Sequence, residues 1–107
     1  MPAGRQLGTF TDASGLVTVV AFMGEAGSDQ DIFNDFAVEV PNDFVAIGGG
    51  VEGARLPQGA LLTASYPNSQ LTAWVGSAKA HQESSPFRIK VWAIGLKIAG
   101  MTRDDLV

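Results

Sequence analysis

The stretch that decides the fold is Phe87-Arg88-Ile89-Lys90-Val91-Trp92-Ala93-Ile94-Gly95-Leu96-Lys97-Ile98. In its first half apolar and charged residues alternate, which is typical of a strand with one buried face. From Trp92 onward the positions that had been charged are also apolar, so this half of the strand has two apolar faces. We therefore expect the far face to be covered by a second sheet, by another subunit or by a further segment of chain.

Outward from this stretch, apolar runs alternate with glycine, proline and asparagine turns. The predicted strands lie at 16–23, 36–40, 44–51, 61–66, 71–75 and 87–98. Pro41-Asn42-Asp43 has turn chemistry and predicts a hairpin between the strands on either side of it. Gly48-Gly49-Gly50 predicts a bulge, a bend or the close approach of another backbone.

Short strands at this spacing predict an all-β fold, namely a compact antiparallel β-sandwich or flattened barrel of six to seven strands. We expect 44–51 and 87–98 to be its central strands. The chain has 107 residues, which predicts a single β domain over 1–107. Thr102-Arg103-Asp104-Asp105 fits an N-cap with acids in a first helical turn, so 101–107 is predicted to begin a C-terminal or linker helix.

The composition excludes several function classes. The absence of cysteine excludes disulfides, thiolate zinc sites and thiol nucleophiles. The net charge of −4 divides into eight acids and one base over 1–52 and three acids and six bases over 53–107, a distribution that favours attraction within the fold or between subunits. Too few basic residues cluster to predict nucleic-acid binding. No apolar run approaches the length of a transmembrane segment, so we expect a soluble protein, either secreted or cytoplasmic.

A set of motifs resembles a little-characterised group of bacterial β-rich modules that sometimes occur in tandem. The motifs are Ala46-Ile47-Gly48-Gly49-Gly50, Leu62-Thr63-Ala64-Ser65-Tyr66-Pro67, Trp74, Lys79-Ala80-His81 and Trp92-Ala93-Ile94-Gly95-Leu96-Lys97-Ile98. The resemblance covers residues 36–100. It implies an all-β fold and a tandem architecture, and it implies no particular reaction. Ala80 stands where the pattern has an acid, which argues against acid-dependent chemistry at that loop.

The predicted ligand-binding residues are Tyr66, Asn68, Trp74, Lys79 and His81. An aromatic platform at Trp74, flanked by polar side chains, would stack on a sugar ring or on an apolar patch of a partner, whereas the alternative places Trp74 in the core. His81 is the only histidine, and no Gly-x-Ser-x-Gly elbow accompanies it. A solvated loop histidine is the simpler interpretation, and no catalytic residues are predicted.

A weak calcium site is predicted in the loop 24–34 and the residue that follows it. Asp29, Asp31 and Asp35 have an Asp-x-Asp-x-x-x-Asp spacing, and calcium accepts such carboxylate ligands. The loop lacks the glycine and glutamate of an EF-hand, so a solvated turn is the competing interpretation. Calcium is the only cofactor that the sequence suggests.

These observations predict a non-enzymatic binding or assembly module that recognises a carbohydrate or a protein surface. Two alternatives stay open: a structural subunit of a larger oligomeric assembly, such as a toxin or capsid-like particle, and a small β-barrel enzyme that uses His81. Self-association is expected because the apolar double face of residues 92–98 and the low charge leave surface to cover.

Overall fold

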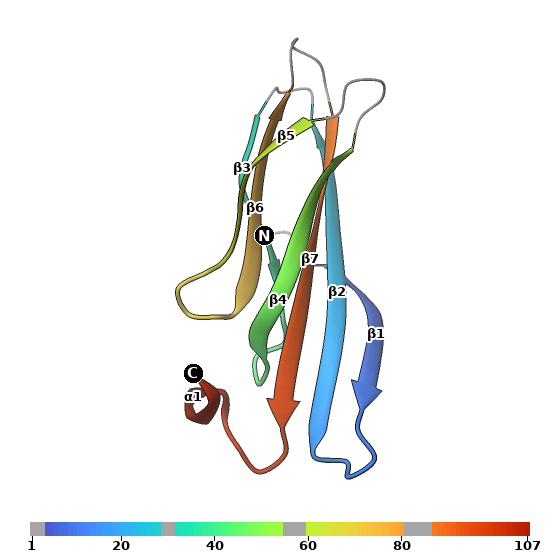
Figure 1. Ribbon diagram of the computed structural model, residues 1–107, viewed down its shortest axis with the longest axis vertical. Helices are drawn as coiled ribbons and strands as arrows, with labels where there is room; N and C mark the ends of the chain where they lie inside the picture. The colour runs from blue at the N-terminus through green and yellow to red at the C-terminus, as the bar shows by residue number, and fades with distance from the viewer. Residues whose placement is uncertain (1–3, 29–31, 55–59, 81–86) are drawn as a thin grey trace.

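A computed structural model describes residues 4–28, 32–54, 60–80 and 87–107 (Figure 1). Within these ranges, seven strands and one short helix follow each other in sequence. They are β1 (Arg5–Thr11), β2 (Val17–Ser28), β3 (Ile32–Glu39), β4 (Val45–Ala54), β5 (Ala60–Pro67), β6 (Ala73–Ala80), β7 (Phe87–Ile98) and α1 (Arg103–Leu106). The prediction of an all-β antiparallel sandwich of six to seven strands is confirmed.

The strands form two antiparallel sheets that pack as a sandwich. The four-stranded sheet has the order β1-β2-β7-β4, and the three-stranded sheet has the order β3-β6-β5. The four-stranded sheet extends beyond the lower end of the three-stranded sheet (Figure 1). β7 is central, as predicted, but the prediction that 44–51 is also central was wrong, because β4 lies at the edge of its sheet.

The predicted hairpin between β3 and β4 was also wrong, although its turn forms. The amide of Phe44 donates to the carbonyl oxygen of Pro41 at 3.0 Å. On either side of this turn, the amides of Val40 and Ala46 donate to carbonyl oxygens of residues 71–72 at 2.9 and 2.8 Å. The segment before β6 therefore separates the two strands, and each continues into a different sheet.

Strand boundaries differ from the prediction at the N-terminal side. β2 continues to Ser28, where the sequence predicted a loop from Gly24. Gly24 pairs with Val91 within the strand, and glycine is required there because a Cβ would approach Val38 of the opposite sheet to 2.6 Å. β1 was not predicted, since its side chains are almost all exposed and show no buried alternation.

The core lies between the sheets and consists mainly of small and β-branched residues. Val38, Ala78, Ile89, Val91 and Ala93 have no exposed surface. Gly76 lets the sheets approach, since a Cβ there would lie 2.5 Å from Val51 and 2.9 Å from Val91. Close packing of this kind makes the core sensitive to a single added methyl group.

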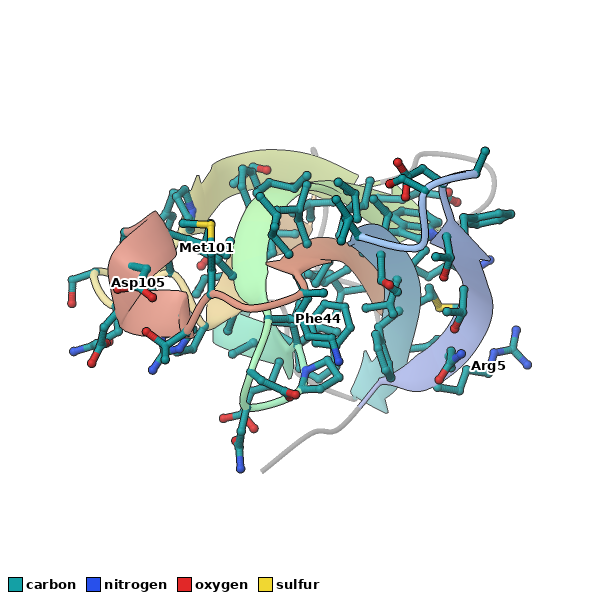
Figure 2. The ribbon with its side chains drawn as sticks, turned by 90° about the horizontal axis from the view of Figure 1, so that it is seen from below. Arg5, Phe44, Met101 and Asp105 are labelled. Atoms are coloured by element: carbon teal, nitrogen blue, oxygen red, sulfur yellow. The ribbon has the colours of Figure 1, made fainter. Side chains whose placement is uncertain are left out.

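At the lower end of the sandwich, Lys97 contacts two residues that precede β4. Lys97 lies 5.2 Å from the ring centroid of Phe44 and 3.5 Å from the carboxylate of Asp43. Phe44 is directed into the space that the strands enclose (Figure 2). Beyond β7, Thr102 caps α1 in a capping box with Asp105, which confirms the predicted N-cap.

Candidate binding surface

The geometry of β7 identifies which of its residues point outward. A Cβ on Gly95 would lie 3.0 Å from Val40 and 3.2 Å from Phe44, so Gly95 faces the interior. Successive side chains of a strand point to opposite faces. Trp92, Ile94, Leu96 and Ile98 therefore project from the outer side of the four-stranded sheet.

The register extends this outer surface over the neighbouring strands. Residues directly opposite each other in adjacent strands share a face. We call the resulting set the outer apolar face: Phe10 of β1, Val17, Val19, Ala21 and Met23 of β2, Val45, Gly48 and Gly50 of β4, and Trp92, Ile94, Leu96 and Ile98 of β7. None of these side chains carries a charge or a carboxylate, amide or hydroxyl group. Met23 and Val45 are buried within the set, and Arg5 of β1 lies opposite Met23 on the same side of the sheet.

Among the described residues, the space above Gly48 and Gly50 and the exposure of Ile94 and Phe10 show that the outer apolar face is accessible there. A Cβ built on Gly48 would have no atom within 4 Å, and one on Gly50 would have only the Trp92 ring at 3.9 Å. Ile94 is 37% exposed and Phe10 is 67% exposed. The three-stranded sheet thus covers the inner face of β7, and the second apolar face predicted from the sequence remains on the surface.

A row of charges marks one end of the outer apolar face. Lys90 of β7 lies directly opposite Glu25 of β2 on one side and Glu52 of β4 on the other. All three share the outward parity of Trp92 and lie one outward position beyond it. Along β2, β7 and β4 the surface therefore changes within two residues from uncharged to a row of alternating charge.

The surface also contains a step, which we call the glycine ledge, formed by Gly48 and Gly50. β4 has no side chain at these two outward positions, while the neighbouring outward positions of β7 are Ile94 and Trp92. The register shifts at Ile47, just before the glycine segment for which the sequence predicted a bulge, a bend or a close approach. Ile47 is 54% exposed beside it.

Gly49, the middle glycine of this segment, differs from Gly48 and Gly50 and accounts for the predicted close approach of another backbone. Gly49 faces inward, and a Cβ there would lie 2.5 Å from Trp74 Cδ2, with the carbonyl oxygen of Trp92 also well inside contact distance. The close approach predicted for Gly48-Gly49-Gly50 is thus made at Gly49. Gly48 and Gly50 have open space instead.

The predicted aromatic residues lie on opposite faces of the three-stranded sheet. Trp74 pairs with the fully buried Val38, packs against the core and donates from Nε1 to Ser65 Oγ at 2.9 Å. Tyr66 pairs with Val75 and is 41% exposed on the other face. The structure does not bring the two rings together into one platform.

Asn68 holds the turn between β5 and β6. Its Oδ1 accepts from the amides of Thr72 and Ala73 at 2.7 and 3.2 Å, and its Nδ2 donates to Thr72 Oγ1 at 2.6 Å. The turn also places Leu71 at a φ of 58°, a backbone conformation that residues other than glycine rarely adopt. These bonds use most of the hydrogen-bonding capacity of the Asn68 side chain.

The structure describes the remaining predicted residues only in part or not at all. His81, Asp29 and Asp31 lie outside the described residues, and Lys79 and Asp35 are described only as strand backbone. Among the described residues, no group of three or more histidine, cysteine or acidic side chains is arranged to hold a metal ion. Those residues also contain no helix with the length and hydrophobicity that a membrane span requires.

A shallow open pocket at the margin of the four-stranded sheet is lined by Arg5, Met23, Gly24 and Glu25. One cation and one carboxylate without a nucleophile do not form a catalytic set.

Comparisons with protein-family models, curated proteins and solved structures found no match for this chain.

Proposed function

We propose that this protein is a non-enzymatic assembly module that packs against another protein through the outer apolar face. One observation carries the proposal: three adjacent strands present uncharged apolar side chains on one sheet face, and a Cβ added at Gly48 of that face would meet no atom within 4 Å. Large exposed apolar patches with a charged margin mark interaction sites in proteins. The charged row of Glu25, Lys90 and Glu52 is such a margin.

The chemistry of this face favours a protein over a carbohydrate as the occupant. Small polar ligands are oriented by precisely placed hydrogen-bonding groups, and apart from the indole N–H of Trp92 the side chains of the outer apolar face supply none. Tyr66 and Trp74 lie on opposite sides of the other sheet, so they do not supply a shared stacking surface. An apolar face suits the desolvated centre of a protein interface.

Site-specific photo-crosslinking tests this proposal. A benzophenone side chain replaces Ile94 in the full chain, and in a control it replaces Glu39, which is exposed on the outer side of the three-stranded sheet. In the native cell extract we expect a discrete protein adduct from position 94 and none from position 39. No adduct at position 94, or equal adducts at both positions, would contradict the proposal.

A further inference from the structure

We infer that the occupant of the outer apolar face is a second copy of this chain, and this inference rests on the proposed function. The two copies pack face to face about a two-fold axis that runs along the strands, between β4 and β7. This axis places β7 of each copy on β4 of the other. Such an interface is isologous, so every contact occurs twice.

The first argument is shape. In each copy Trp92 is directly opposite Gly50, and Ile94 is directly opposite Gly48. The two-fold axis exchanges these positions between copies, so each Trp92 and Ile94 lies over the glycine ledge of the other copy. The open space above Gly48 is then filled by a side chain that has no such place in the monomer.

The second argument is charge. Because Lys90 is directly opposite Glu52, the same axis brings Lys90 of each copy against Glu52 of the other, which gives two complementary contacts at the end of the interface. An axis along β7 itself would instead oppose Lys90 to Lys90. An axis across the strands would lay the charged row over the apolar end at Val17 and Ile98, where desolvating charge is costly.

The area of contact sets the strength of the dimer. The outward positions of β7 that lie beside β4 run from Lys90 to Leu96, about 20 Å at 3.3 Å per residue, and two strands span about 10 Å. The overlap is therefore roughly 200–300 Å² of flat surface per copy, against about 800 Å² of accessible surface per partner in a standard stable interface. We expect a weak, reversible dimer.

Sedimentation velocity over a series from low micromolar to millimolar concentration tests the inference. The weight-average mass should rise from 11.2 kDa toward twice that value. Gly48→Val should remain monomeric throughout without losing stability, because a Cβ at this position meets no atom within 4 Å in the monomer. Gly48→Ala is a smaller second variant, which should weaken the dimer less.

A charge exchange supplies an independent reading. Glu52→Lys alone should weaken the dimer roughly tenfold or more, because it opposes two lysines across the interface. Adding Lys90→Glu to the same chain should restore association. Glu39→Lys has the same charge change on the opposite side of the molecule and should leave the dimer constant unchanged.

The outcomes separate this inference from the proposed function. A monomer at every concentration overturns the second copy as occupant, and so does a dimer that neither Gly48→Val nor Glu52→Lys weakens. If the monomer still forms an adduct from position 94 with a different protein, the assembly function stands without self-association. If neither a dimer nor an adduct forms, both proposals fail.

Discussion

Adding one methyl group at each of Gly48, Gly49 and Gly50 should give three variants with opposite effects on stability. At Gly48 and Gly50 the nearest atom to a new Cβ is 3.9 Å away or farther. Replacing glycine by alanine where the backbone permits it stabilises a protein by about 0.4–1 kcal/mol, chiefly because the unfolded chain loses freedom. We expect Gly48→Ala and Gly50→Ala to gain that amount.

Gly49→Ala should lose stability. Its Cβ would lie 2.5 Å from Trp74 Cδ2, whereas carbon atoms in contact prefer about 3.5–4.0 Å. The indole is held by its bond to Ser65, and the other close atom is the carbonyl oxygen of Trp92 in the central strand. Neither can retreat by 1 Å without breaking a hydrogen bond, so we expect a cost of about 1–3 kcal/mol, typical of overpacked cores.

The free energy of unfolding should therefore differ by roughly 1.5–4 kcal/mol between Gly48→Ala and Gly49→Ala. Urea denaturation at low protein concentration, followed by tryptophan fluorescence, measures this difference without a contribution from association. For a domain of this size each 1 kcal/mol shifts the melting temperature by about 4–8 °C. Equal midpoints for the two variants would refute the inward orientation of Gly49 and, with it, the assignment of Gly48 and Gly50 to the outer face.

Three further measurements test other parts of the structure. Asn68→Ala should lower the free energy of unfolding by about 1–3 kcal/mol, because it leaves two partly buried backbone amides without their acceptor; an unchanged urea midpoint would contradict this role. The hydrogen bond from Ser14, together with bonds from backbone amides, lowers the pKa of Asp12, so its stabilising contribution is present above the unfolded pKa and is lost as the pH falls through the lower folded pKa. Carbon-detected NMR titration should show that lowered pKa and its return toward the ordinary value in Ser14→Ala; an Asp12 that titrates identically in both proteins would refute the cause. Ser65→Ala should shift the emission of Trp74, measured in a Trp92→Phe background, because it removes the acceptor of the indole N–H; emission that does not respond would rule out this hydrogen bond.

The alternation of apolar and polar residues predicted the positions of the strands better than it predicted which strands pair with each other. Period two along 87–98 identified a strand with two apolar faces, and the structure places it in the centre of its sheet. The same logic correctly located the turn at Pro41, but it paired the flanking strands with each other. Turn chemistry is local, whereas the amides of Val40 and Ala46 donate to the carbonyl oxygens of Thr72 and Leu71, far away in the sequence.

The candidate surface was predicted in part. The outward row Trp92, Ile94, Leu96 and Ile98 follows from the sequence, and so does the need for something to cover it. The glycine ledge does not follow, because three consecutive glycines look alike in sequence and differ only in what lies next to each. Trp74 was ambiguous for a related reason: both parities of β6 are buried at Val75 and Ala78, so alternation could not say which face holds the core.

The position of β7 also affects how the chain acquires its structure during synthesis. β2 and β4 bond to β7 and not to each other, yet β7 is the last of these seven strands to leave the ribosome. Until Ile98 has emerged, both strands have an unpaired edge and an apolar surface, a state that is prone to aggregation. A nascent chain that stalls before residue 87 should therefore need protection by chaperones, whereas the three strands of the smaller sheet are already present by Ala80.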